Sequence, residues 1–70
     1  KKQLDCVKSI YIEVEFVSLY EGASLFSEVE IFLREHGFIF FQFYDQVRSP
    51  ENGRLLYGDA IFLNSKYFSL

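Results

Sequence analysis

Two carboxylates, Glu13 and Glu15, lie two residues apart within the apolar run Ile10–Val17. Side chains alternate between the faces of a strand, so both carboxylates are expected on the same face. Burying a carboxylate is costly unless a partner satisfies it, and functional sites are where proteins accept that cost. The pair therefore indicates a site that orients a substrate or a cation. The structural alternative is a hydrogen bond to neighbouring backbone or to a basic residue.

The loop expected after this strand, Ser18–Ser24, adds two candidates, Tyr20 and Glu21. Binding residues occur disproportionately on loops that a rigid scaffold positions. A tyrosine combines an apolar ring with a polar tip, which suits the wall of a pocket; the alternative is that its ring packs against the following helix. Tyr20 and Glu21 therefore join the two strand glutamates as substrate-binding candidates.

Three other reactive side chains have ordinary structural explanations. His36 falls in the last turn of a predicted helix, where a cation complements the helix dipole. Asp59 follows Gly58 and suits a hydrogen bond to hairpin backbone. Cys6 lacks a neighbouring base or basic cluster that would activate a thiol. None of the three is assigned a catalytic role.

Apolar periodicity predicts the elements that position these residues. The order is the end of a helix, a strand, a helix and two further strands. The predicted ranges are 1–9 for the helix end, Ile10–Val17 for the first strand, Leu25–His36 for the helix, Phe38–Tyr44 and Leu55–Leu63 for the last strands, and Asn64–Leu70 for a loose tail. The short connection Gln46–Gly53 favours an antiparallel hairpin between the last two strands.

The residues at the ends of the helix act as boundary signals. Gly37 is the expected stop after the last turn. At the start, Ser24 is a candidate N-cap, while Ser27 followed by Glu30 offers a competing capping box. The start of the helix is thus left open by one turn.

The apolar pattern also predicts which strand faces are buried. Tyr11 and Val17 flank the two glutamates, which indicates that this face of the first strand is covered, as in a parallel sheet with helices on both sides. Phe38–Tyr44 is almost continuously apolar and is expected to be buried on both faces. Gly58 inside the last strand predicts a bulge or a close backbone approach.

Composition excludes several classes of function. The net charge is −3 and the seven basic residues are scattered, which argues against a nucleic-acid surface. The sequence contains no run of eighteen apolar residues, so it does not predict a membrane span. The single cysteine cannot form an internal disulfide, and with one histidine it is too little for a structural zinc site. These features favour a protein of the reducing cytoplasm.

The aromatic content is high for the length, with nine Phe and five Tyr in 70 residues. A domain of this size has a small interior, so either a large apolar face is exposed or another domain or subunit covers it. We therefore expect the chain to be part of a larger protein.

Three separated blocks resemble the C-terminal region of FkbM-family methyltransferases. They are E-V-E-F-V-S-L-Y-E-G from Glu13, L-F-S-E-V-E-I-F-L-R-E-H-G-F from Leu25 and G-R-L-L-Y-G-D-A-I-F-L from Gly53. The likeness runs from about Ser9 to Leu63. It implies the C-terminal part of an α/β, Rossmann-like class I methyltransferase domain, in which a parallel strand and a helix precede an antiparallel hairpin.

The resemblance implies transfer of a methyl group from S-adenosylmethionine to a hydroxyl group of a sugar or natural product. Glu13 matches a glutamate typical of the family, and the loop after its strand is expected to border the acceptor pocket. Two positions depart from the family pattern: proline is common where Ser18 stands, and a small or polar residue is more usual at Glu15. The added carboxylate puts the usual acceptor in doubt.

The cofactor site is not expected within residues 1–70. The four glycines are isolated, so none of them forms the Gly-rich turn between a strand and a helix that would hold S-adenosylmethionine. We expect residues upstream to bind the cofactor and this segment alone to be inactive. Its expected partner is a small-molecule or glycan acceptor.

Two alternatives remain open. In the first, the chain is a non-enzymatic α/β interaction or regulatory module that forms a homo-oligomer through its Phe-rich surface. In the second, it belongs to a methyltransferase-like domain that has lost catalysis. The first alternative requires a cooperatively folded, free-standing unit. The second depends on cofactor residues outside this sequence.

Overall fold

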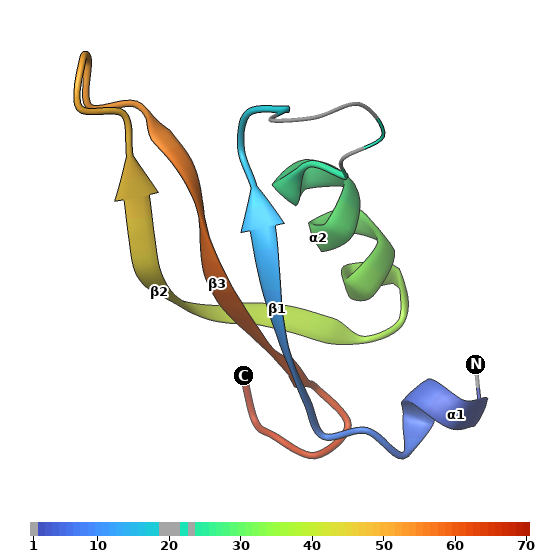
Figure 1. Cartoon of the computed structure of the whole chain (residues 1–70). Coiled ribbons are helices and arrows are strands. Elements are labelled where there is room, and N and C mark those ends of the chain that lie inside the picture. The colour runs from blue at the N-terminus through green and yellow to red at the C-terminus, as the bar shows by residue number, and fades with distance from the viewer. Residues whose placement is uncertain (1, 19–21, 23) are drawn as a thin grey trace.

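The computed structural model of the chain describes residues 2–18, 22 and 24–70, and three strands and two helices form in them (Figure 1). The elements are α1 (Lys2–Asp5), β1 (Ser9–Glu15), α2 (Phe26–Glu35), β2 (Phe38–Arg48) and β3 (Leu55–Asn64). The predicted order of helix end, strand, helix, strand and strand is confirmed. Strand β2 runs four residues further than its apolar run suggested, so the hairpin connection is shorter than expected.

The three strands form one open sheet in the order β1-β3-β2. Strand β3 lies in the middle and pairs antiparallel with both neighbours, which confirms the predicted hairpin. The α2 crossover returns the chain so that β2 runs in the direction of β1, and β3 then inserts between them. The expected parallel pairing of β1 is therefore not found among the described strands. The described residues form a small α/β fold with an antiparallel sheet.

Helix α2 ends as the sequence predicted but begins differently. Gly37 follows it with φ +89°, a left-handed conformation that glycine adopts readily. The N-cap is Leu25, so the prediction of a serine cap was wrong. An isolated parallel bridge to Glu15 keeps Leu25 extended, with φ −85° and ψ 160°. The backbone N–H of Leu25 then donates to Glu28 Oε1 at 2.9 Å, which serves as half of a capping box.

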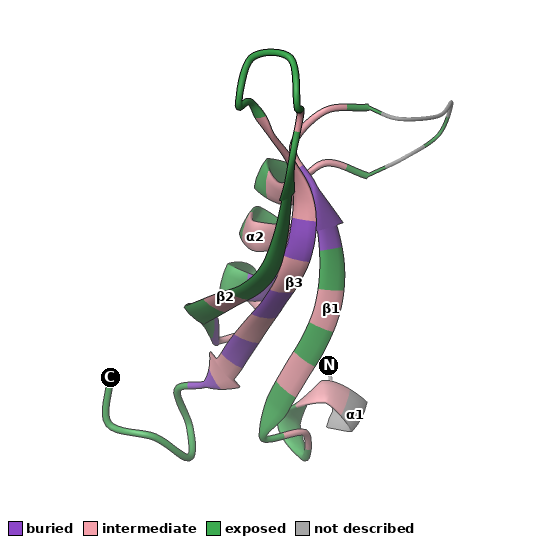
Figure 2. Cartoon of the chain, turned by 60° about the vertical axis from the view of Figure 1, so that its left-hand side comes forward, coloured by how far each residue is buried: buried purple, intermediate pink, exposed green. Residues whose placement is uncertain are grey.

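The core lies between α2 and one face of the sheet. Alternate residues of β3 are buried, as the banding along this strand shows (Figure 2). The buried apolar side chains are Val14, Leu33, Phe38, Ala60 and Phe62. Aromatic rings extend this core: Phe40 meets Phe62 edge to face, with ring centroids 5.6 Å apart, and it meets Phe26 of α2 at 5.5 Å. The helix is therefore attached to the sheet largely through phenylalanine.

The opposite face of the sheet is open in the described residues, which corrects two predictions. Strand β2 was expected to be buried on both faces, but only Phe38 is buried and Phe41 is 55% exposed. Tyr11, on the face of β1 expected to be covered, is 64% exposed. The physical reason is that a single helix packs on this sheet, so one face of it remains in solvent (Figure 2).

Gly58 allows a close approach between β3 and β2, as predicted. A Cβ atom at this position would lie 2.5 Å from Cζ of Phe43, closer than packed atoms can come. The register of β2 also shifts between Tyr44 and Val47, opposite this part of β3. Asp45 lies in the shift with a left-handed φ of 52°. The register shift in β2 thus lies opposite the glycine in β3.

The segment Asn64–Leu70, predicted to be a loose tail, begins with the last residue of β3 and is held by hydrogen bonds at Asn64 and Tyr67, which corrects this prediction. Asn64 is buried, and its side-chain N–H donates to the carbonyl oxygen of Val7 at 2.8 Å. The hydroxyl of Tyr67 donates to the carbonyl oxygen of Asp5 at 3.0 Å. These bonds fasten the C-terminal segment to the residues around α1.

The core predicts a strong difference between two phenylalanines. Phe62→Ala should lower the free energy of unfolding by about 3–5 kcal/mol, because its ring is fully buried between β1, β2 and α2. Phe41→Ala, the control on an exposed side chain, should change it by less than about 0.5 kcal/mol. Urea denaturation followed by circular dichroism measures both. Equal losses in the two variants would contradict this description of the core.

Candidate functional site

The two candidate glutamates both lie in β1, near its C-terminal end, but in different environments. Glu13 is exposed and lies opposite Asp59 of β3. Glu15 is only 9% exposed and lies opposite Tyr57. Sequence spacing placed the two carboxylates on the same strand correctly. It gave no indication that only the second would be buried.

Glu15 Oε1 is a buried carboxylate oxygen without a hydrogen-bond partner in the described residues. Its burial follows from its position, since β3 flanks it on one side and the segment entering α2 is bridged to its backbone on the other. A buried charged oxygen without a donor is unfavourable by several kcal/mol in general, so such groups need an explanation. Sites that await a ligand are one such explanation.

Both glutamates line a pocket of about 290 Å³ at this end of β1. Ser24 and Val29 complete its wall on the α2 side, together with Ile12 of β1. The volume is close to the lower end of the range for small-molecule sites. The predicted carboxylate pair is thus brought to a pocket that has both polar and apolar walls.

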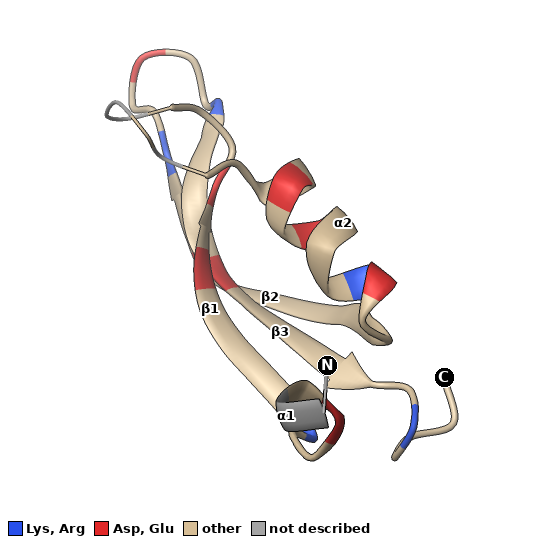
Figure 3. Ribbon diagram, turned by 90° about the vertical axis from the view of Figure 1, so that its right-hand side faces the viewer, with Lys and Arg blue, Asp and Glu red and all other residues tan. Residues whose placement is uncertain are grey.

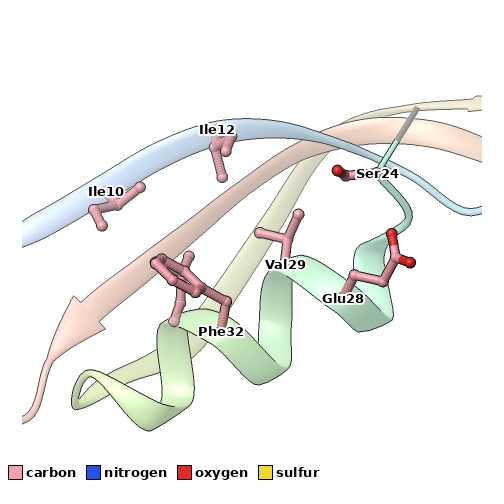
Figure 4. A pocket seen from close by; sticks show the side chains of 7 residues that line it. Ile10, Ile12, Ser24, Glu28, Val29 and Phe32 are labelled. Carbon is pink, nitrogen blue, oxygen red and sulfur yellow. The ribbon is translucent and has the colours of Figure 1, made fainter. Parts of the chain in front are cut away.

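A second, apolar pocket of about 360 Å³ continues between β1 and α2. Figure 4 shows Ile10 and Ile12 projecting from β1 toward Val29 and Phe32 of the helix, with Ser24 and Glu28 at one end. Three residues line both pockets: Ile12, Ser24 and Val29. The two pockets therefore form one groove, which we call the β1–α2 groove, with an acidic end at Glu15 and an apolar end at Phe32.

Most of the residues that line the groove were not predicted from the sequence. Ser24 was considered only as a helix cap, and Ile12 and Val29 were only parts of the apolar patterns that predict the first strand and the helix. Their types and spacing are those of any packed strand and helix, so no sequence signal separates them from the core. The other two predicted candidates, Tyr20 and Glu21, lie outside the described residues.

Acidic residues dominate the surroundings of the groove. Figure 3 shows acidic segments along β1, β3 and α2, and basic segments mainly toward the two ends of the sheet. The basic residue within α2, Arg34, is 3.0 Å from Glu30 and forms an exposed ion pair with it. This pair also raises the pKa of Arg34 through the hydrogen bond and the charge of Glu30. In the described part of the chain, no cation is recorded against Glu13 or Glu15.

The open face of the sheet, to which the pairing register with β3 also assigns Glu13, carries a polar contact. The hydroxyl of Tyr11 donates to Asp59 Oδ2 at 3.3 Å. The pKa of Tyr11 is raised above its usual 10.0, first by loss of hydration and then by the charge and hydrogen bond of Asp59. Tyr11 is 64% exposed. Of the causes that raise its pKa, the charge and hydrogen bond of Asp59 can be removed by a substitution.

The remaining reactive side chains have structural roles or no described contact. His36 is the C-cap of α2, and its Nδ1 lies 2.9 Å from the carbonyl oxygen of Phe32, which accepts the bond. Cys6 is a free, exposed thiol. Among the described residues, no group of three or more His, Cys, Asp and Glu side chains is arranged to hold a metal ion.

Neither described helix has the length and hydropathy needed to cross a bilayer. No protein-family model, curated protein or solved structure matches this chain. The assignment of function therefore depends on the groove and its residues.

The contact between Tyr11 and Asp59 predicts a titration. Asp59→Asn should lower the pKa of Tyr11 toward 10.0, because it removes the neighbouring negative charge. The raised pKa means that the native state holds the proton more tightly than the unfolded state. This contribution to stability is complete below a pH of about 10 and is lost as the pH rises through the native pKa.

An ultraviolet difference titration against Tyr11→Phe isolates this residue from the other tyrosines. Glu51→Gln, which removes one charge in the distant hairpin turn, is the control and should leave the pKa of Tyr11 unchanged. If the pKa of Tyr11 stays the same in Asp59→Asn, the hydrogen bond between Tyr11 and Asp59 is contradicted.

Proposed function

We propose that this chain is the acceptor-side, C-terminal portion of an S-adenosylmethionine-dependent methyltransferase that methylates a hydroxyl group of a sugar or natural product. The observation that carries the proposal is the pocket at the C-terminal end of β1, which is lined by both Glu13 and the buried Glu15. This is the end of the strand where such an enzyme would receive its acceptor.

The topology is compatible with the proposal. A strand, a helix and an antiparallel hairpin follow one another, in the order implied by the resemblance to FkbM-family methyltransferases. The outer edge of β1 is not paired with another strand of the described sheet. Further strands of a Rossmann-like domain could extend the sheet there.

The chemistry asks little of this segment beyond position and proton transfer. Bound cofactor supplies the sulfonium methyl group for an in-line displacement. This segment would have to hold the acceptor hydroxyl in position, and a base would have to take the proton of that hydroxyl. Glu13 is exposed at the mouth of the pocket and can accept a hydrogen bond from the hydroxyl. Its proposed role is to orient the acceptor.

The described residues do not fit the cofactor itself. The connection between β1 and α2 holds one glycine, Gly22, with φ +85°, where phosphate- and nucleoside-binding turns use several. Residues outside 1–70 would have to bind S-adenosylmethionine. The chemistry of methyl transfer is therefore testable only in a longer protein.

The decisive experiment uses the full-length product of the encoding gene. With isotopically labelled S-adenosylmethionine, it should transfer label to a hydroxylated acceptor, and Glu13→Gln should lower kcat/KM by about 10²-fold or more, since a positioned carboxylate contributes on that scale. Glu51→Gln, in the exposed hairpin turn, is the matched control. A full-length product that neither binds the cofactor nor transfers label would refute the assignment.

The exposed face of the sheet favours a second candidate, an interaction module that dimerises. Tyr11, Ile39, Tyr44 and Val47 are all at least 36% exposed, and their pairing register with β3 puts them on the same face. Exposed apolar patches often mark protein interfaces. In this alternative, the groove would not take part in catalysis.

The two candidates differ in the behaviour of residues 1–70 alone. A free-standing module should unfold cooperatively and sediment as a dimer, and Tyr44→Lys on the open face should convert it to a monomer. A methyltransferase segment should instead bind a hydrophobic dye through its uncovered sheet face. Sedimentation and dye fluorescence of the same sample distinguish these outcomes.

A further inference from the structure

We infer that the β1–α2 groove binds a ligand with a positively charged amine on an apolar body, and that the acceptor of the proposed methyl transfer is therefore an amino alcohol rather than a neutral sugar. The inference rests on the proposed function for the hydroxyl group only. The amine and the apolar body are argued from the groove itself.

The requirement for a cation comes from Glu15. Its Oε1 is buried and has no donor in the described residues, and Glu15 is one of the residues that line the pocket. A hydroxyl group would donate one hydrogen bond but would leave the buried negative charge without compensation. An ammonium group supplies both a donor and the opposite charge. Glu13 also lines this pocket, and its exposed carboxylate keeps the role proposed above, toward the hydroxyl group.

The protein does not supply this cation from the residues described around the groove. Arg34, the basic residue of α2, is bound to Glu30. Glu28 lies at the same end of the groove, but its Oε1 accepts the backbone N–H of Leu25. Of the three carboxylates along the groove, Glu28 is used by the helix cap, and Glu13 and Glu15 remain for a ligand.

The apolar body of the ligand follows from the continuity of the groove. The acidic pocket and the apolar pocket share Ile12, Ser24 and Val29. A ligand held by its amine at Glu15 would therefore lie along Ile12 and Val29 toward Phe32. Phe32 is 53% exposed and would lose contact with water when the groove fills.

Binding of two matched probes tests the inference. The isotope-labelled full-length product of the encoding gene is titrated with cyclohexylmethylamine and with its neutral analogue cyclohexylmethanol, and backbone amide shifts are followed by NMR. The amine should bind about tenfold or more tightly than the alcohol, because a hydrogen bond to a charged partner is the stronger contact. The largest shifts should lie along the groove, at Glu15, Val29 and Phe32.

Three variants separate the contributions. Glu15→Gln should remove the preference for the amine without lowering the melting temperature, since it also removes an uncompensated buried charge. Phe32→Ala should weaken both probes by a similar factor, because the apolar wall does not distinguish them. Glu51→Gln changes the same charge far from the groove and should leave both affinities unchanged.

Equal affinities for the two probes, or an equal effect of Glu15→Gln and Glu51→Gln, would overturn the inference. So would the absence of amine binding, because that result would mean that a basic side chain of the protein itself occupies Glu15. The proposed function fails separately: if the amine binds but the full-length product transfers no methyl group, the amine site stands and the enzyme assignment does not. Conversely, equal methyl transfer to amine-free and amine-bearing acceptors would overturn the amine site alone.

Discussion

The pairing of β3 with both of its neighbours is the interaction on which the rest of this structure depends. Strand β3 forms the only two ladders of the described sheet, and its buried residues Ala60 and Phe62 provide the floor on which α2 packs. Gly58 lets Phe43 approach the same strand closely. Any change that displaces β3 would separate β1 from β2 and would remove the surface that holds the helix.

The position of α2 then decides where the groove forms. Aromatic contacts fasten the N-terminal part of the helix to the sheet, with Phe26 stacked on Phe16 at 5.0 Å between ring centroids. Further along, Val29 and Phe32 stand away from Ile10 and Ile12, which leaves the apolar part of the groove between them (Figure 4). Tight packing at one end of the helix and looser packing along it produce a binding surface from otherwise ordinary core residues.

The buried Oε1 of Glu15, at the end of this groove, has no hydrogen-bond partner among the described residues. In a fold with so small a core, a buried charge without a partner substantially lowers the stability of the native state. An apolar residue in place of Glu15 would pack better. The amine ligand proposed above would give this residue a function. The same logic does not apply to Glu13, which remains hydrated, and the two glutamates are accordingly assigned different roles.

The sequence by itself determined the order of the elements, the end of α2 at Gly37, the antiparallel hairpin and the placement of both glutamates in one strand. These features depend on local periodicity and on backbone preferences, which are encoded within a few residues. Tertiary structure alone decided that Glu15 is buried while Glu13 is exposed, that Leu25 rather than a serine caps the helix, and that most of β2 faces solvent. Burial depends on what packs against a residue, and neither the bridge between Glu15 and Leu25 nor the insertion of β3 between two strands can be read from nearby sequence.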